Sequence, residues 1–503
     1  MGFVAMVFGV VVAVHYYLWH RLVRATTLPG RTRRVLTWLL VAAGVLVPLA
    51  MTGSRSGWGH FLAWPGFFWL AVMFYLLIFL VVLEVPRALA LLVLRSRERR
   101  SSEEALARRP ADRRARRVEG PDPAAGEPAG EPAGRSAGEP VRAGTGDRAR
   151  SAGPAQEAAR PLPGGAAEEP GTGTAADTTG TDAAGAYGAA VAGRAEGGAE
   201  DPGSRGGAGE AIGRRLFIAR AAAAVAGVGA LSTVGYGVRT ALGDPVVESV
   251  KVRLPRLDPR LSGLRFAVVS DIHLGPLTGM GHSERIVRMI NSLRADVVAV
   301  VGDLVDGTVA ELGHLARPLA DLESRYGSYF VTGNHEYYTA NGPGEWLEEL
   351  RELGVRPLRN ERVEIAHAGA VLDLAGVDDL AGATGGPGSG PVGTPDTAGA
   401  GGGPDFERAL GGRDRSRSVV LLAHQPVQAA RAAEYGVDLQ LSGHTHGGQM
   451  VPFNLAVPLQ QPVVAGLGEV DGTQVYVTRG AGFWGPPVRV GAPPEITLLE
   501  LRA

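Results

Sequence analysis

Cysteine is absent from this chain of 503 residues. Its absence excludes disulfide-bonded scaffolds, thiolate zinc sites, iron–sulfur clusters and thiol nucleophiles, and leaves the redox compartment open. Any metal ion must therefore be held by His, Asp, Glu or Asn side chains. A surplus of charge is absent as well, because 50 Lys and Arg residues stand against 51 Asp and Glu residues. Without a basic surplus, nucleic acid is not an expected partner.

Bulky apolar side chains are scarce in the middle of the chain. Region 97–212 consists largely of Ala, Gly, Pro, Glu and Arg, it repeats Gly-Glu-Pro from Gly126, Gly130 and Gly138, and its one aromatic residue is Tyr187. Such a composition cannot bury enough apolar surface to offset the conformational entropy of the chain. We therefore predict a disordered linker that acts as a spacer.

Long apolar runs, in contrast, fill region 1–96. Three of them, at 3–19, 35–51 and 65–85, are 17 to 21 residues long, about the length that a helix needs to cross the hydrocarbon core of a bilayer. Tryptophans lie at or near their ends, where the membrane interface favours amphipathic rings. The runs predict three transmembrane helices, with a hydrophobic soluble domain as the alternative.

Basic residues in the short connections predict the orientation of these helices. Five arginines crowd the first connection, between Arg21 and Arg34; Arg55 stands alone in the second; and four arginines follow the third run, from Arg95 to Arg100. The first connection and the linker are then cytoplasmic, and the N-terminus lies outside the cell.

A fourth, weakly hydrophobic helix is expected at 213–243. It opens with the paired Arg214 and Arg215 before Leu-Phe-Ile, a pattern that resembles a twin-arginine export signal placed inside the chain. An ordinary stop-transfer helix with a basic flank is the alternative, and both interpretations carry the rest of the chain outward. The expected location is the cell membrane, with several crossings and an extracytoplasmic C-terminal domain. Twin-arginine or general export machinery is the expected partner, and the helix is expected to remain as an anchor.

From residue 244 to 503, short β-branched runs alternate with polar and helical stretches, which is typical of an α/β domain. Helices are expected at 283–293, 345–353 and 426–435. The low-complexity stretch 381–403 is predicted to be a loop insertion. Eight strands are expected, at 266–270, 297–301, 329–332, 371–375, 419–423, 439–441, 475–478 and 496–499.

Side chains that bind metals follow five of these expected strands. Loops at the carboxyl ends of such strands converge on one crevice, so groups distant in sequence are expected to meet there. Each motif is weak alone, because an Asp-x-His pair is commonly a surface accident and a lone His is commonly structural. Because every group directly follows an expected strand, the combination indicates a metal site more strongly than any single motif does. The groups are Asp271 with His273, Asp303, Asn334 with His335, His424, and His444 with His446.

These residue types suit two divalent metal ions that share one carboxylate ligand. Asp303 is the natural bridge between the ions. Asp271 and His273 are two positions apart, as are His444 and His446, so each pair points to one side of an extended segment. Glycines at three of these loops permit the backbone to approach the cluster closely: Gly302, Gly333 and Gly443.

The set D-x-H, GD, GNHE, H and GHTH resembles the calcineurin-like metallophosphoesterases. The segment LSGHTHGGQ at 441–449 and the closing GPPVRVGAPPEITLLEL are similar to the membrane-anchored, twin-arginine-associated bacterial branch of that family. The resemblance covers about residues 250–503. It implies a four-layer α/β/β/α sandwich with a dimetal site at the strand ends.

The resemblance also implies a role for each residue of the site. His335 would lie beside the substrate phosphate as the catalytic residue, where it would stabilise the transition state or protonate the leaving oxygen. Ligation without thiolate favours Mn, Fe or Zn over Mg as the two divalent ions. One ion would be held by Asp271, His273, Asp303 and His446, and the other by Asp303, Asn334, His424 and His444.

Several neighbouring residues leave two interpretations open. Glu336 either supports the metal ligands or starts a helix, and Asp306 either orients a ligand or caps a turn. The remaining histidines of the domain, His282, His314 and His367, are expected in the core or on the surface.

The predicted reaction is an in-line attack on phosphorus by a metal-bridging hydroxide. An outward-facing enzyme beside a membrane meets lipid-linked phosphate esters and pyrophosphates, which are the favoured substrates. Aromatic and aliphatic residues near the site would form an apolar lip for acyl chains, or would pack into the core: Phe453, Leu455, Phe483 and Trp484.

Three alternative functions remain. The first is hydrolysis of a soluble extracytoplasmic phosphodiester, and the second is a non-catalytic, metal-binding membrane scaffold. The third, a transporter, rests on the first three helices, whose ionisable residues His15 and Glu84 are too few to build a translocation path.

The topology is tested by a reporter enzyme, active only outside the cytoplasm, fused after Ala503. We expect activity, because the charge pattern places the chain end outside. Fusion after Arg100 serves as the control and should give an inactive reporter. A cytoplasmic signal at Ala503 would overturn the orientation.

Overall fold

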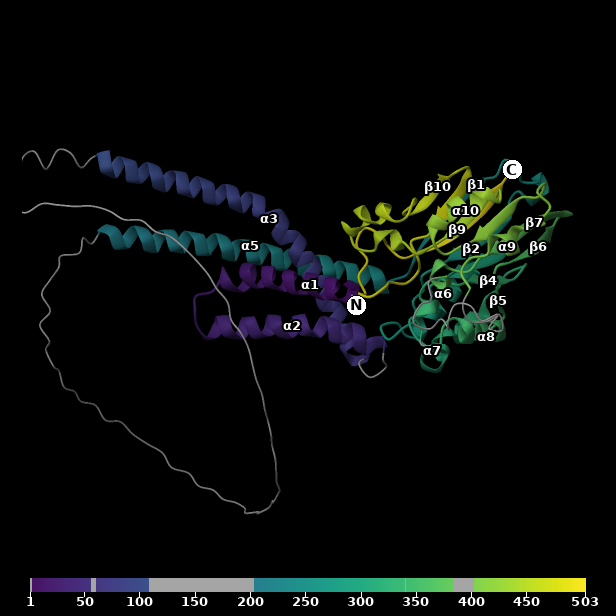
Figure 1. Cartoon of the computed structure of the whole chain (residues 1–503), viewed down its shortest axis with the longest axis horizontal. Helices are drawn as coiled ribbons and strands as arrows, with labels where there is room; N and C mark the ends of the chain where they lie inside the picture. The colour runs from purple at the N-terminus through teal and green to yellow at the C-terminus, as the bar shows by residue number, and fades with distance from the viewer. Residues whose placement is uncertain (1, 56–59, 108–202, 340, 384–401) are drawn as a thin grey trace, which may run out of the picture. The chain divides into compact units, whose positions relative to one another are not determined.

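The computed structural model describes residues 2–55, 60–107, 203–339, 341–383 and 402–503 (Figure 1). Most of the predicted linker at 97–212 and of the predicted loop insertion at 381–403 therefore lies outside the described residues. Residues 99–203 form a unit separate from the rest of the chain.

Long apolar helices precede the C-terminal domain: α1 (Gly2–Leu18), α2 (Arg31–Arg55), α3 (His60–Ala107) and α5 (Gly203–Leu242). Among the residues that the structure describes, three segments are long and apolar enough to cross a membrane: Arg31–Gly53, Phe61–Arg97 and Gly213–Leu242. The 17 residues of α1 continue directly into the π-helical turn Trp19–Arg24, and a crossing by this first helix stays a prediction.

Two helices extend beyond the boundaries expected for the linker. α3 continues to Ala107, and α5 already begins at Gly203. Extending an established helix by one residue adds one hydrogen bond and avoids the cost of nucleation. Composition alone therefore placed the helix ends too close to the apolar runs.

Small residues let α5 pack closely in the helix bundle. Ala226, Ala230 and Val234 recur every fourth residue of α5 and are fully buried. They belong to one buried cluster with Tyr75 and Leu76 of α3. Small side chains permit close approach of helix backbones. In a membrane the hydrophobic effect does not drive helices together, so their association depends on such close packing.

Polar contacts link the helices at several levels. Glu84 of α3 accepts a hydrogen bond of 3.0 Å from the Tyr17 hydroxyl and forms an ion pair with Arg21. His15 accepts a hydrogen bond of 3.1 Å from the Trp69 indole. The two ionisable residues considered for a transporter are therefore engaged in contacts between helices.

In the described part of the C-terminal domain, the strands form two six-stranded mixed sheets. In the first sheet β2, β3, β4 and β5 are parallel, and in the second β7, β8, β9 and β11 are parallel. The order of the first sheet is β1 (Val246–Arg253), β12 (Glu495–Arg502), β2 (Arg265–Val269), β3 (Val297–Val301), β4 (Ser328–Val331) and β5 (Val355–Pro357). The order of the second is β10 (Gly466–Val470), β11 (Thr473–Val477), β9 (Leu439–Ser442), β8 (Val419–Leu422), β7 (Ala370–Gly376) and β6 (Glu361–His367).

The buried clusters define four layers. One cluster contains inner residues of both sheets, among them Phe266 and Leu372, so the sheets pack face to face. A second joins the outer face of the first sheet to α6 (Met280–Ser292), α7 (Val309–Ala316) and α8 (Gly344–Glu352). A third joins the other sheet to α9 (Phe406–Leu410) and α10 (Ala429–Glu434). The predicted α/β/β/α sandwich is confirmed.

All eight predicted strands are present, and the four that were missed share one property. β1, β5, β6 and β10 are the outermost strands of their sheets. An edge strand is partly exposed and carries polar residues, so it lacks the continuous apolar run by which an inner strand is found. The alternating exposure along β1 shows this pattern.

Close packing of α5 predicts sensitivity to added volume at Ala230. We expect Ala230→Leu to destabilise the detergent-solubilised chain by about 1–3 kcal/mol, because overpacking forces the helices apart. Val228→Leu is the matched control, since Val228 is 68% exposed on the same helix. Thermal unfolding of both variants checks the prediction, and equal stability would contradict it.

Candidate dimetal site

The metal-binding side chains lie in loops at the carboxyl ends of parallel strands. Asp271 follows β2, Asp303 follows β3 and Asn334 follows β4 in the first sheet, while His424 follows β8 and His444 follows β9 in the second. The carboxyl ends of parallel strands lie at one edge of a sheet. Because the two sheets pack face to face, these two edges lie next to each other. All seven predicted ligands and His335 thus come into one region.

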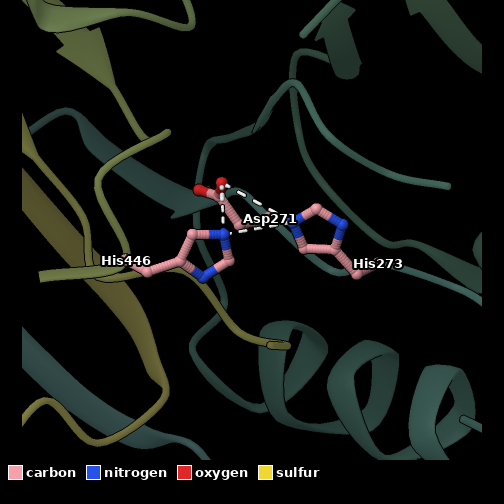
Figure 2. A group of neighbouring side chains, drawn as sticks. All are labelled: Asp271, His273 and His446. Carbon is pink, nitrogen blue, oxygen red and sulfur yellow. Dashed lines mark hydrogen bonds and ion pairs between the residues drawn. The ribbon is translucent and has the colours of Figure 1, made fainter. Parts of the chain in front are cut away.

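The first group contains Asp271, His273 and His446 (Figure 2). The two imidazole Nε2 atoms lie 3.1 Å apart. Asp271 Oδ1 is 3.3 Å from Nε2 of His446 and 4.0 Å from Nε2 of His273. All three side chains are buried, so three donor atoms face one another away from bulk water.

The second group contains Asp303, His424 and His444. Asp303 Oδ2 lies 3.2 Å from Nε2 of His424 and 3.9 Å from Nε2 of His273, a member of the first group. Asn334 Oδ1 lies 2.9 Å from Nδ1 of His444. Asp303 is thus the residue between the two groups, in the place that a bridging carboxylate would take.

Five of these residues have a left-handed backbone conformation. Their φ angles are between 50° and 70°, a region that residues other than Gly adopt infrequently, although Asn, Asp and His do so more often than the rest. Such strain costs on the order of 1–3 kcal/mol per residue and persists where the surroundings impose it, commonly at functional sites. The residues are Asp271, His273, Asp303, His444 and His446.

A cation fits this donor set because one buried ring nitrogen lacks a partner. Nδ1 of His424 lies 2.8 Å from the Val301 carbonyl and must donate to it, so Nε2 is the free ring nitrogen. Among the described residues, Nε2 has no hydrogen-bond partner and faces Asp303 Oδ2. A lone pair and a carboxylate oxygen repel each other unless a cation or a proton lies between them.

Neutral imidazoles are the form that binds metals, and the surroundings of two histidines favour this form. Burial lowers the pKa of His444 to about 3. Burial and the Arg489 guanidinium hold the pKa of His446 well below its usual value.

Asp306 orients two histidines of the site. Its Oδ1 accepts hydrogen bonds from Nδ1 of His273 at 2.9 Å and from Nδ1 of His335 at 2.6 Å. Burial raises the pKa of Asp306, but His273 and His335 outweigh burial and the pKa is lowered overall. Of the two interpretations from sequence, orientation of a ligand is the one that the contacts match.

His335 lies at the rim of the cluster. Burial lowers its pKa, but the carboxylates of Asp303 and Asp306 have the larger effect and raise the pKa to about 9. Its ring meets that of His273 edge to face, with ring centres 4.6 Å apart. Since Nδ1 is engaged with Asp306, Nε2 is the ring atom left to meet a ligand.

Glu336 holds the loops that carry the ligands. Its buried carboxylate accepts backbone hydrogen bonds from Asp303 at 3.1 Å, Leu304 at 2.8 Å and Gly333 at 2.7 Å. It also starts the 3₁₀ turn Glu336–Tyr338. The two interpretations from sequence are both correct, and the carboxylate fixes the β3 and β4 loops relative to each other.

All three of the predicted glycines are required by close approach. A Cβ atom at Gly333 would lie 2.2 Å from Asp303 Oδ1, and a Cβ atom at Gly443 would lie 2.0 Å from the Ser270 hydroxyl. The third, Gly302, has a φ of 79°. Any side chain at the first two positions would displace the neighbouring ligand loop.

Arg489 is a residue that the sequence motifs did not indicate. Its fully buried guanidinium donates to the carbonyls of Gly482 at 2.6 Å and His446 at 2.8 Å. Nη2 also lies 3.1 Å from Nδ1 of His446. A lone arginine near the chain end carries no spacing pattern, so only the fold reveals that it supports a predicted metal ligand.

The other histidines of the domain lie outside the cluster, as expected. Nε2 of His282 is 3.3 Å from the Ile272 carbonyl in the core. His314 is exposed on α7, and Nδ1 of His367 contacts the Tyr326 hydroxyl at 2.8 Å.

A cavity of about 410 Å³ opens beside the cluster. Its polar wall includes His273, Asp306 and His335. Its apolar wall includes Phe67 and Leu70 of α3, together with Met51, Tyr338, Phe483 and Trp484. Of the predicted apolar lip, Phe483 is buried whereas Trp484 is 51% exposed.

Comparison with known proteins agrees with this geometry. The family model described as calcineurin-like phosphoesterase matches residues 264–448. A bovine "Transmembrane protein with metallophosphoesterase domain" is 42% identical over 59% of this chain, and the alignment spans 66% of that protein, just under two thirds of its length. An uncharacterized metallophosphoesterase of Helicobacter pylori is 37% identical over 54% of this chain and 68% of its own length. Another, from Aquifex aeolicus, is 34% identical over 51% and 91%. The chain belongs to the calcineurin-like phosphoesterase family.

Proposed function

We propose that the chain is a membrane-anchored, metal-dependent phosphoesterase with an outward-facing catalytic domain, and that its substrates are lipid-linked phosphate esters or pyrophosphates. The observation that carries the proposal is the composition of the cavity. One wall holds His273 and His335, and the other holds Phe67 and Leu70, which lie within a segment apolar enough to cross a membrane. A polar phosphate and an apolar chain on one substrate match the two walls.

Two divalent ions would be held by the two groups of ligands. Mn, Fe or Zn suits the imidazole and carboxylate donors. When bound, the ions would neutralise phosphate oxygens and lower the pKa of the attacking water. The first ion would take Asp271, His273, Asp303 and His446, and the second Asp303, Asn334, His424 and His444.

The protein's own residues position the substrate and move a proton. His335 reaches the cavity with its Nε2 atom, because Asp306 holds Nδ1. In this position His335 would donate a hydrogen bond to a phosphate oxygen or a proton to the leaving oxygen. Glu336 and Arg489 would act through other residues, by holding the ligand loops in place.

Delivery to the outside of the cell would use the apolar segment of α5, which begins next to Arg214 and Arg215. Either twin-arginine or general export would place the domain on the same side, where it meets the outer leaflet. We propose membrane lipids and lipid-linked cell-surface precursors as the substrate class, and a soluble phosphodiester as the second candidate.

Removal of the shared ligand tests the reaction. We expect Asp303→Ala to reduce hydrolysis of a generic phosphodiester by at least about 100-fold, because both ions lose a ligand. The purified full chain would be stripped of metal and supplied with Mn, Zn or Mg. Asp414→Ala serves as the control on an exposed aspartate. Asp303→Asn keeps the side-chain volume should the Ala variant not fold, and full turnover in a folded variant would refute the dimetal assignment.

A companion variant separates catalysis from scaffolding. His335→Ala removes no predicted metal ligand, so a chain that acts only as a metal-binding scaffold would keep its cellular effect. A phosphoesterase would lose that effect while its metal content and thermal stability stay unchanged.

The apolar wall tests the substrate class. We expect Phe67→Ala to lower kcat/KM for a phosphate ester of a long-chain lipid by about tenfold, because burial of an aromatic side chain contributes about 1.5–3 kcal/mol. Hydrolysis of a short soluble ester should stay unchanged. Phe68→Ala is the matched control, since Phe68 is 39% exposed and is not part of the cavity wall. Equal losses with both substrates would favour the soluble candidate.

A further inference from the structure

An uncharged loop follows the last histidine of the site. No Asp, Glu, Lys or Arg occurs between His446 and Glu469. Within this stretch, residues 451–459 form two successive 3₁₀ turns, Phe453–Leu455 and Val457–Leu459. We refer to residues 451–459 as the docking loop.

Apolar side chains of the docking loop face away from the protein. Val451 is 40% exposed, Phe453 54%, Leu455 75% and Leu459 86%. Scattered exposed apolar residues are ordinary on a protein surface, but four within nine successive positions are a concentration that suits an interaction surface. The absence of charge excludes a partner that is recognised through ion pairs with this loop.

The position of the loop along α5 indicates what covers it. The Arg489 backbone N–H donates to the Gly237 carbonyl at 2.9 Å, and a Cβ atom at Gly237 would lie 2.4 Å from Val488. Gly237 precedes the end of the apolar segment Gly213–Leu242 by five residues, about 7.5 Å along a helix. If Gly213–Leu242 crosses the membrane, the segment that contains Val488 would lie close to the membrane boundary.

The docking loop is joined to this segment. The Val451 backbone N–H donates to the Val490 carbonyl at 3.0 Å. Met450, directly before the loop, packs with Val490 against the buried cluster of the apolar helices. A loop attached at membrane depth, with its apolar side chains exposed, meets lipid before it meets any other partner.

Trp484 connects the loop to the cavity. Gln449 donates to the Trp484 carbonyl at 2.8 Å and accepts from the Trp484 backbone N–H at 3.0 Å. The half-exposed indole of Trp484 belongs to the cavity wall. Tryptophan favours the membrane interface, so the loop and the mouth of the cavity would lie at the same level.

We propose that the docking loop inserts its apolar side chains into the lipid leaflet on the side of the catalytic domain, next to α5. Insertion of shallow apolar side chains into the boundary between headgroups and acyl chains is driven by the apolar area that it buries. The surface is distinct from the cavity and takes a lipid bilayer as its partner, whatever reaction the site performs.

The absence of cysteine permits a direct test. Leu455→Cys in the full chain would be labelled with an environment-sensitive fluorophore and reconstituted into phosphatidylcholine vesicles, with and without brominated acyl chains. Lys251→Cys, exposed on β1 and seven residues beyond Asp244, is the control. We expect brominated lipid to quench the label at 455 at least about twofold more than the label at 251, and aqueous iodide to show the reverse order.

Two outcomes would overturn the proposal. Equal accessibility of both labels to iodide, without quenching by brominated lipid, would place the loop in water. A blue-shifted emission at 455 that disappears as the protein-to-lipid ratio falls, again without quenching by bromine, would assign the surface to a second copy of the chain. Because quenching is independent of turnover, the same measurement in an Asp303→Ala background separates this proposal from the proposed activity.

Discussion

The site depends on one constraint: carboxylates and ring nitrogens that repel one another are buried together where the strand ends of the two sheets meet. Asp271 and Asp303 are buried among four imidazoles, and Nε2 of His424 faces a carboxylate oxygen with no other partner among the described residues. An isolated buried carboxylate is costly unless it is paired or binds a cation. The Glu336 hydrogen bonds to three loop amides and the buried Arg489 hold the ligand loops in place against this cost.

The apolar helices contribute to the site as well as to its attachment. Phe67 and Leu70 line the cavity that His335 also lines, and Gly237 accepts a hydrogen bond from the backbone of Arg489, whose side chain supports His446. A catalytic domain separated from these helices would lose one cavity wall and one support. The association of the domain with its helices therefore bears on which substrate fits as well as on where the protein resides.

Much of the fold and of the candidate site was predictable from local pattern. Inner strands are buried on both faces, so each of the eight predicted strands appears as an apolar run, whereas the edge strands β1, β5, β6 and β10 do not. The ligands were found because each follows such a run directly. Arg489 was missed because its partners, Gly482 and the His446 carbonyl, are backbone groups that leave no signature in sequence.

The sequence by itself determined the chemistry that is available: donors without thiolate, their order behind strands, and apolar helices before the domain. These properties are local, because residue type and spacing follow directly from the chain. Only the tertiary structure decided which atoms face one another, since the 3.1 Å between His273 and His446 joins residues 173 positions apart. It also decided that Asp306 orients two histidines and that Phe67 shares a cavity with His335. Such contacts depend on how two sheets and a helix bundle pack, and packing is a property of the whole chain.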